Sequence, residues 1–186
     1  GGGAGIQADI KTISMMGGHA MTAITAITAQ NTLGVDAVHA VPSDMVAAQV
    51  EAVVGDIGVD AVKIGMIGSA ETANMVADIL GGLSVPVIFD PVMVATSGAM
   101  LADKDAVAAF DRLMSIATLV TPNIPELEAL GGRSRILDHG CHLLEKGGHG
   151  DGDMIVDRLI GPDGPVREWA DERISTRNTH GTGCTL

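Results

Sequence analysis

The stretch "DAVKIGMIGSAETANMVADILGGLSVPVIFD", residues 60–90, contains the pattern that decides the fold class. It begins and ends with the short, nearly continuous apolar runs "DAVKIGM" and "VPVIFD", which are typical of strands covered on both faces. Between these runs lies "AETANMVADIL", which we interpret as a helix. A strand, a helix and a second strand in this order favour a parallel pair of strands joined by a helical crossover.

The same alternation continues on both sides of this stretch. Ile6, Ile10 and Ile13 recur at helical spacing, and "SDMVAAQVEAVVGDIG" predicts a helix with Ser43 as its N-cap. Between these helices, residues 19–30 alternate β-branched and small side chains, which predicts a strand before the turn "NTLG". Further along, "DKDAVAAFDRLM", "TLVTP" and "IPELEAL" predict a helix, a strand and a helix. The whole pattern predicts an α/β fold with a mainly parallel central sheet and helices on both faces.

The regular alternation ends near Gly132. The segment "RSRILDHG" is short for a crossover to the next apolar run, "CHLLEKGG", and we expect residues to be missing here. Beyond it, "MIVDRLI" and "VREWADERI" predict two strands joined by the turn "GPDGP". The chain opens on glycines and closes where a helix begins. We therefore expect residues 1–186 to form a single domain that is incomplete at both ends and near Gly132.

Composition favours a small-molecule role. The chain has 23 acidic and 11 basic residues and a formal net charge of −12, which opposes a nucleic-acid partner or an anionic membrane surface. No uninterrupted apolar run approaches the roughly 18–20 residues of a membrane-spanning helix. Cys141 and Cys184 are the only cysteines, and we expect both to be free thiols. These features predict a cytoplasmic protein.

Residues that end the predicted strands are the first candidates for a site, because ligands bind beyond the carboxyl ends of parallel strands. They include Gln30, Met66, Asp90, Asn123 and Lys146. We expect these side chains to converge on one rim of the sheet. Lys146 is followed by two glycines, so it can offer positive charge to a phosphate where the backbone also comes close.

Asn123 and Glu126 have two interpretations. They stand three residues apart at a helix start, so they share one face and offer two oxygens to a hard cation such as Mg²⁺. Spacing alone favours the alternative, an ordinary helix cap with an acidic first turn. The surrounding sequence favours the interpretation as a metal site.

The final stretch "RNTHGTGCTL", residues 177–186, is suited to an anion. Its glycines leave backbone N–H groups uncovered and its threonines add hydroxyl donors at a predicted helix start. Cys184 taken alone is more typical of a buried small residue, but its place after Gly-Thr-Gly favours a functional thiol. A cation, a metal pair and an anion cradle are together the parts of a phosphoryl-transfer site.

Seven motifs carry a family resemblance: "GGAGIQADIKT", "TAITAQNT", "DAVKIGM", "DPVM", "TPNIPE", "KGGH" and "NTHGTGCTL". In this order they resemble the hydroxymethylpyrimidine/phosphomethylpyrimidine kinases of thiamine biosynthesis, in the ribokinase superfamily. The resemblance implies a ribokinase-like fold and a homodimer. It also implies that ATP and Mg²⁺ are used to phosphorylate 4-amino-5-hydroxymethyl-2-methylpyrimidine, and then its monophosphate to the diphosphate.

The resemblance also assigns residues to roles. It implies that the pyrimidine pocket is formed by Ala4, Asp9, Thr28, Gln30 and Met66. It implies that the metal lies near Asp90, Asn123 and Glu126. The nucleotide is expected at Lys146, Thr179, Gly181 and Gly183. The catalytic set is expected to be Cys184, Lys146, Gly181, Thr182 and Gly183, with Cys184 as the base that takes the hydroxymethyl proton.

Three alternatives stay open at this point. Pyridoxal kinase is a sister activity; some of these enzymes that resemble the family use a second cysteine after "DPVM", and the absence of cysteine in "VATSGAML" favours the pyrimidine. A non-catalytic vitamin-binding domain is opposed by the presence of Asn123, Glu126, Lys146 and Cys184 together. A cysteine hydrolase built on Cys184 and His180 is disfavoured, because residues four apart at a helix start are no reliable dyad.

Overall fold

The computed structural model describes residues 2–94, 101–102, 104–149 and 152–175. The helices are α1 (Ile6–Met15), α2 (Ser43–Asp56), α3 (Ala70–Leu80), α4 (Lys104–Ile116), α5 (Ile124–Ala129) and α6 (Arg133–Leu137), with one 3₁₀ turn, η1 (Gly147–His149). The strands are β1 (Ala26–Gln30), β2 (Val35–Ala40), β3 (Val62–Ile64), β4 (Val87–Phe89), β5 (Leu119–Val120), β6 (His142–Glu145), β7 (Met154–Gly161) and β8 (Gly164–Glu172).

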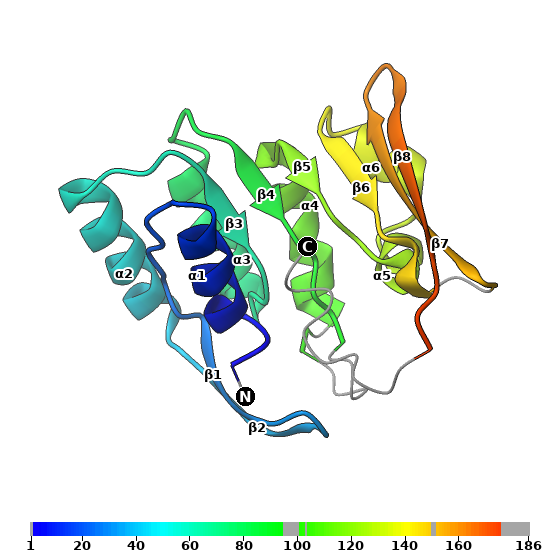
Figure 1. Cartoon of the computed structure of the whole chain (residues 1–186). Coiled ribbons are helices and arrows are strands. Elements are labelled where there is room, and N and C mark those ends of the chain that lie inside the picture. Colours follow the sequence, from blue (N-terminus) through cyan, green and yellow to red (C-terminus); the bar gives the residue numbers. More distant parts are fainter. Residues whose placement is uncertain (1, 95–100, 103, 150–151, 176–186) are drawn as a thin grey trace.

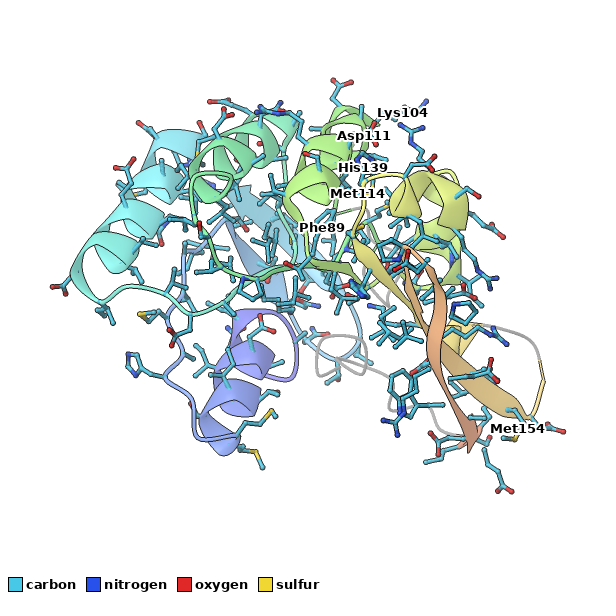
Figure 2. The ribbon with its side chains drawn as sticks, turned by 90° about the horizontal axis from the view of Figure 1, so that it is seen from above. Phe89, Lys104, Asp111, Met114, His139 and Met154 are labelled. Carbon is cyan, nitrogen blue, oxygen red and sulfur yellow. The ribbon has the colours of Figure 1, made fainter. Side chains whose placement is uncertain are left out.

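The central sheet has six strands in the order β3-β4-β5-β6-β7-β8 (Figure 1). Strands β3 to β6 are parallel neighbours, whereas β7 and β8 form an antiparallel hairpin that extends the sheet from β6. Seen from above, α2, α3 and α4 lie on one face of the sheet and α1 lies on the other (Figure 2). The predicted α/β class, the mainly parallel sheet and the helices on both faces are confirmed.

The main core lies between the sheet and α3 and α4. Both helices bury a stripe with helical spacing: Ala73, Val76, Ala77 and Leu80 on α3, and Ala106, Phe110, Leu113 and Met114 on α4. The ring of Phe89 on β4 meets that of Phe110 edge to face, with centroids 5.1 Å apart. Both rings are fully buried, and each such burial contributes about 2–3 kcal/mol to stability. This packing holds the parallel strands in register, so that their carboxyl ends share one rim.

The strand predicted over residues 19–30 was too long. Only Ala26–Gln30 forms a strand, and it pairs antiparallel with β2 in a separate two-stranded sheet. Before it, Gln49 of α2 binds the backbone of Ile24 at both its N–H (2.9 Å) and its carbonyl (3.1 Å). Alternating β-branched residues indicate extended backbone, but they do not show whether a strand or a side chain supplies the hydrogen bonds. The turn that follows β1 is as predicted, with Asn31 Oδ1 accepting from two backbone N–H groups.

The predicted N-cap of α2 was also wrong by one residue. Pro42 occupies the cap position and Ser43 is the first helical residue. The Ser43 hydroxyl donates instead to the Glu71 carboxylate of α3. A tertiary contact between neighbouring helices has therefore replaced the local cap.

The short crossover near Gly132 is made by two small helices. Helix α5 ends at Ala129, α6 begins at Arg133, and the two glycines between them have φ angles of 90° and 88°. These left-handed conformations let the chain turn sharply and still connect parallel neighbours β5 and β6. The expectation of missing residues at this point, like that of an incomplete single domain, stays a prediction.

Candidate active site

Three predicted residues meet at the carboxyl ends of neighbouring strands. Asp90 follows β4, Asn123 follows β5 and Lys146 follows β6. The Lys146 ammonium lies 2.9 Å from Asp90 Oδ1, with 11% and 5% of the two side chains exposed. Lys146 also donates its backbone N–H to the carbonyl of Pro122 at 3.0 Å, which ties it to the end of β5. The parallel sheet thus brings a cation and a carboxylate together from segments 56 residues apart.

Asn123 and Glu126 form a capping box at the start of α5. Asn123 Oδ1 accepts from the N–H of Glu126, and Glu126 Oε2 accepts from the N–H of Asn123, each at 2.9 Å. This is the helix-cap interpretation, and it fixes the Glu126 carboxylate at the same rim as Asp90 and Lys146. Glu126 is nevertheless buried, which is unusual for an ordinary first-turn acid.

The burial of Glu126 shapes the electrostatics of this rim. Desolvation raises the pKa of Glu126, and the neighbouring Asp90 raises it further. The backbone N–H of Asn123 and the charge of Lys146 act in the opposite direction on the same pKa. Asp90 and Glu126 thus share one partly desolvated rim with Lys146. Two carboxylates beside one ammonium favour the binding of a further cation.

The rim opens into a cleft of about 1650 Å³. The predicted pyrimidine-pocket residues all contribute to its lining: Ala4, Asp9, Thr28, Gln30 and Met66. Asp90, Asn123, Glu126 and Lys146 line the same cleft. The predicted phosphate-side and pyrimidine-side residues that the structure describes are therefore joined by one continuous space.

Among the predicted pyrimidine-pocket residues, Asp9 forms an ion pair that sequence reasoning missed. Its Oδ1 lies 2.6 Å from the ammonium of Lys63, and about a quarter of each side chain is exposed. Asp9 belongs to α1 and Lys63 to β3, so the pair joins the two across the cleft wall. A lysine inside the apolar run "DAVKIGM" was the available signal, because such a residue needs a partner or an opening to solvent.

Hydrogen bonds also fix the backbone around the other predicted pocket residues. The Thr25 hydroxyl donates to the carbonyl of Met66 at 2.7 Å, which connects the start of the β1 segment to the end of β3. Thr28 donates to Gln30 Oε1 at 3.5 Å, from the same strand. These contacts orient the wall that carries Thr28, Gln30 and Met66.

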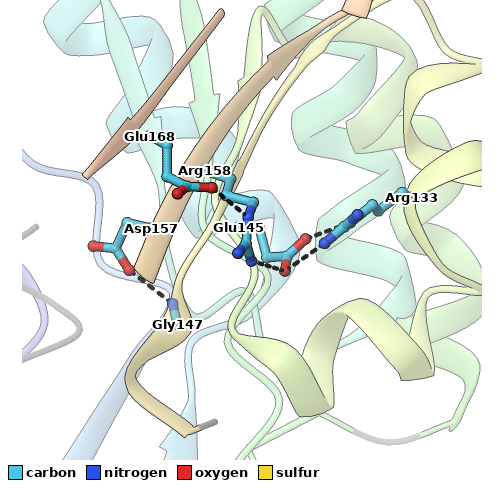
Figure 3. Close-up of polar contacts among 6 residues, drawn as sticks. All are labelled: Arg133, Glu145, Gly147, Asp157, Arg158 and Glu168. Carbon is cyan, nitrogen blue, oxygen red and sulfur yellow. Dashed lines mark hydrogen bonds and ion pairs between the residues drawn. The ribbon is translucent and has the colours of Figure 1, made fainter. Parts of the chain in front are cut away.

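Position 147, directly after Lys146, requires glycine for a structural reason in addition to the predicted access to phosphate. The N–H of Gly147 donates to Asp157 Oδ1 at 2.7 Å (Figure 3). A Cβ atom at Gly147 would lie 2.1 Å from the carbonyl oxygen of Val156, so the β7 backbone leaves no room for a side chain. The close approach of β7 therefore requires glycine at this position.

Glu145, the acidic neighbour of Lys146, points to the opposite face of β6. It accepts two hydrogen bonds from Arg133, at 2.6 and 2.8 Å, and lies 3.6 Å from Arg158 (Figure 3). The hydrogen bonds from Arg133 lower the pKa of Glu145. Because side chains alternate along a strand, Glu145 joins β6 to α6 and β7 without facing the cleft.

The remaining predicted residues lie outside the described part of the chain. They are Thr179, Gly181, Thr182, Gly183 and Cys184. Within the described residues, no helix is long and apolar enough to cross a membrane. Cys141 is buried in the core, as expected for a thiol without a site role.

Comparison with known proteins decides the family. The family described as phosphomethylpyrimidine kinase matches residues 1–186. The chain belongs to this family. It is 47% identical to the hydroxymethylpyrimidine/phosphomethylpyrimidine kinase of Rhizobium meliloti, over all of this chain and 75% of that protein. It is 45% identical to the thiamine biosynthesis multifunctional protein ThiED of Corynebacterium efficiens, again over all of this chain. The chain spans only 27% of that longer relative.

Solved structures support the same ribokinase-like fold. The phosphomethylpyrimidine kinase of Clostridium difficile superposes with a TM-score of 0.79 and 39% identity, over 92% of this chain and 79% of that one. An ADP complex of Bacillus subtilis pyridoxal kinase superposes with a TM-score of 0.86 and 30% identity, over 99% and 76%. The fold is thus shared by two substrate classes, whereas sequence identity is greater to the pyrimidine kinases.

Proposed function

We propose that this family member transfers the γ-phosphate of ATP to 4-amino-5-hydroxymethyl-2-methylpyrimidine, and then a second phosphate to the resulting monophosphate. The observation that carries the proposal is the single cleft in which the Lys146–Asp90–Glu126 rim adjoins the wall of Asp9, Gln30 and Met66. Relatives named as hydroxymethylpyrimidine/phosphomethylpyrimidine kinases match the whole chain and support this choice of acceptor.

Lys146 would act on the phosphate being transferred. Its ammonium is fixed by Asp90 and by the ends of β5 and β6, so it can stabilise developing negative charge without reorganisation. On the pyrimidine side, the Gln30 amide can donate and accept side by side, which suits an aminopyrimidine edge. With these two roles, the acceptor hydroxyl would lie between the two walls of the cleft.

The donor set also fits Mg²⁺. Asp90 and Glu126 are two buried carboxylates at one rim, and carboxylate oxygens are the ligands this ion prefers. Asn123 would support the site by holding Glu126 through the capping box. No group of three or more acidic, histidine or cysteine side chains that could hold a metal occurs among the described residues. This fits an ion that keeps several waters and binds substrate phosphates, where it neutralises phosphate charge.

The first test is ADP release by the full-length protein with magnesium and ATP. Hydroxymethylpyrimidine, its monophosphate and pyridoxal should be compared as acceptors at matched concentrations. Preference for the two pyrimidines is the expected result. Preference for pyridoxal would retain the phosphate chemistry and overturn the acceptor, while no turnover with any acceptor would favour a vitamin-binding domain.

Cys184 is proposed as the base that takes the proton from the acceptor hydroxyl. Cys184→Ala should lose turnover far more than affinity for ATP, because the thiolate would act on the acceptor and not on the nucleotide. Cys141→Ala is the matched control, since burial raises the pKa of the Cys141 thiol and keeps it protonated. Near-normal turnover in Cys184→Ala would remove Cys184 from this role.

A homodimer and a cytoplasmic location complete the proposal. The homodimer rests on the family resemblance, and the cytoplasmic location rests on the composition and cysteine content of the chain. Sedimentation of the full-length protein at several concentrations tests the first, and cell fractionation tests the second.

A further inference from the structure

The antiparallel pairing of β6 with β7 stops just before the glycine turn. The last registered pair is Glu145 with Arg158. Beyond it, the N–H of Gly147 donates to the side-chain oxygen of Asp157, at 2.7 Å. A carboxylate has therefore taken the place of a backbone acceptor at the point where the chain leaves the sheet (Figure 3).

Asp157 lies on the same side of the sheet as Lys146. The β6–β7 register places Asp157 one residue from Arg158, whose partner Glu145 faces away from the cleft. Asp157 lines the cleft with Lys146 and is half-buried. Its partner in the turn is a backbone N–H, so this hydrogen bond requires only that Asp157 offer an acceptor oxygen at this position.

Lys146 is consequently held from two neighbouring strands. Its own N–H donates to Pro122, beyond β5, and the N–H of the next residue donates to Asp157 of β7. Gly147 is pressed against Val156, so the turn has little freedom to shift toward β7. A small rotation at Gly147 would redirect the Lys146 side chain, whose ammonium reaches Asp90.

Arg173, the residue after β8, fixes the far end of the turn. The Arg173 guanidinium donates to the carbonyls of Gly148 and Gly152, at 2.9 and 2.8 Å. Arg173 also donates its backbone N–H to Asp153 at 2.7 Å. Residues of β7 and the residue after β8 therefore contact the described glycines that follow Lys146, with Asp157 bound to the glycine next to the lysine.

We propose that Asp157 is a positioning residue for Lys146: its carboxylate oxygen fixes Gly147 and thereby sets the direction of the lysine ammonium toward the phosphate side of the cleft. This role rests on the proposed kinase function. It depends on an acceptor oxygen and not on negative charge. Asp157→Asn should therefore preserve the role and Asp157→Ala should not.

The test uses the full-length protein with Asp157→Ala, Asp157→Asn and the control Glu168→Gln. Glu168 is an exposed residue of the same hairpin whose partner is Arg158. Turnover with magnesium and ATP should fall about 10- to 100-fold in Asp157→Ala, as expected for a displaced catalytic group. Asp157→Asn and Glu168→Gln should retain turnover near that of the unchanged protein.

Two measurements separate positioning from general damage. Binding of hydroxymethylpyrimidine without nucleotide should be unchanged in Asp157→Ala, because Asp9, Gln30 and Met66 lie on the other side of the cleft. Amide hydrogen exchange at Lys146 and Gly147 should become faster in Asp157→Ala and stay slow in Asp157→Asn.

Several results would overturn the proposal. These are normal turnover in Asp157→Ala, failure of Asp157→Asn to restore turnover, or a parallel loss of pyrimidine binding. If the unchanged protein released no ADP with either pyrimidine, the proposed function would fail instead. Hydrogen exchange would then still test the contact, because unchanged exchange at Gly147 in Asp157→Ala would overturn the positioning role by itself.

Discussion

The cleft contains two lysine–aspartate pairs in different surroundings. Lys146 and Asp90 are 2.9 Å apart with 11% and 5% of their side chains exposed. Lys63 and Asp9 are 2.6 Å apart with 26% and 22% exposed. The first pair lies at the ends of two parallel strands, β4 and β6, of the central sheet, whereas the second joins helix α1 to β3, an edge strand of the described sheet.

The difference separates a fixed side of the cleft from an adjustable one. Breaking a buried pair leaves an uncompensated charge and typically costs about 3–5 kcal/mol, while a solvent-exposed pair is worth about 1 kcal/mol or less. The proposed phosphate side is also fixed by the capping box of α5 and by the hydrogen bond from Gly147 to Asp157. We infer that the Lys146–Asp90 pair, on the proposed phosphate side, is part of the folded core, and that the proposed pyrimidine wall can be altered at little cost in stability.

Lys146→Met is expected to have the largest effect. Turnover should fall about 10²–10³-fold, as for loss of a preorganised charge stabiliser. The free energy of unfolding at neutral pH should fall by about 3 kcal/mol, because Asp90 and Glu126 would keep no cation between them. Lys146 lowers the pKa of Glu126, so its loss raises that pKa, and the deficit should shrink as the pH falls and Glu126 takes up a proton.

Lys104→Met is the control for this comparison, since Lys104 is an exposed lysine at the start of α4. It should change neither turnover nor stability. Denaturant unfolding and ADP release on the three proteins provide the check. Equal stability of Lys146→Met and Lys104→Met would refute the idea that the Lys146–Asp90 pair belongs to the core.

The two glycines after Lys146 provide the next test. Gly147→Ala should lower the free energy of unfolding by about 1–3 kcal/mol, because the new methyl group meets the backbone of Val156. Gly148→Ala should be nearly neutral, since a Cβ there meets no atom within 4 Å. Turnover should fall with Gly147→Ala as the lysine is displaced. If the two variants unfolded alike, close approach of β7 would not be the reason for glycine at position 147.

Glu126 and Glu145 should give pH dependences of opposite sign. Burial raises the pKa of Glu126 in the folded state, so the folded protein binds a proton more readily there, and its contribution to stability is lost as the pH rises through the raised pKa. Hydrogen bonds from Arg133 lower the pKa of Glu145, so its contribution is present above the unfolded pKa of about 4.3 and is lost as the pH falls through the lowered one.

Unfolding of Glu126→Gln and Glu145→Gln between pH 4 and pH 8 measures this contrast. The stability of Glu126→Gln relative to the unchanged protein should increase with pH. Glu145→Gln should be less stable near pH 7, by about 1 kcal/mol since Arg133 is half-exposed, and should approach the unchanged protein at low pH. Slopes of the same sign would contradict the two different causes of these pKa shifts, burial at Glu126 and hydrogen bonds from Arg133 at Glu145.

The convergence of Asp90, Asn123 and Lys146 was predictable from sequence, and the reason is topological. Strands β3 to β6 are parallel and consecutive, so their last residues must share a rim, and Asp90, Asn123 and Lys146 follow directly from the element pattern. Turn and hairpin signals near β7 and β8 were equally local and were confirmed. Such predictions need only the order of the elements.

The contacts that were missed depend on packing between distant segments. The partner of Asp9 is 54 residues away, and the Asp157–Gly147 bond requires the register of an antiparallel pair. Similarly, residues 19–25 read as strand because their side chains favour extended backbone, while Gln49 supplies the hydrogen bonds to Ile24. Local sequence patterns predict the backbone conformation of a segment, but they do not predict which distant residue forms hydrogen bonds with it.

Lys63→Met tests the adjustable side and should have the smallest effect on stability. The free energy of unfolding should change by less than about 1 kcal/mol, because the pair with Asp9 is partly open to solvent. If Asp9 contacts the pyrimidine as proposed, loss of its partner should raise KM for hydroxymethylpyrimidine about tenfold, equivalent to about 1.4 kcal/mol, with kcat and KM for ATP unchanged. Lys11→Met, an exposed lysine on α1, should leave all three values unchanged. A rise in KM for ATP in Lys63→Met would mean that the two sides of the cleft are coupled through α1 and β3, and the division drawn from the two ion pairs would then be wrong.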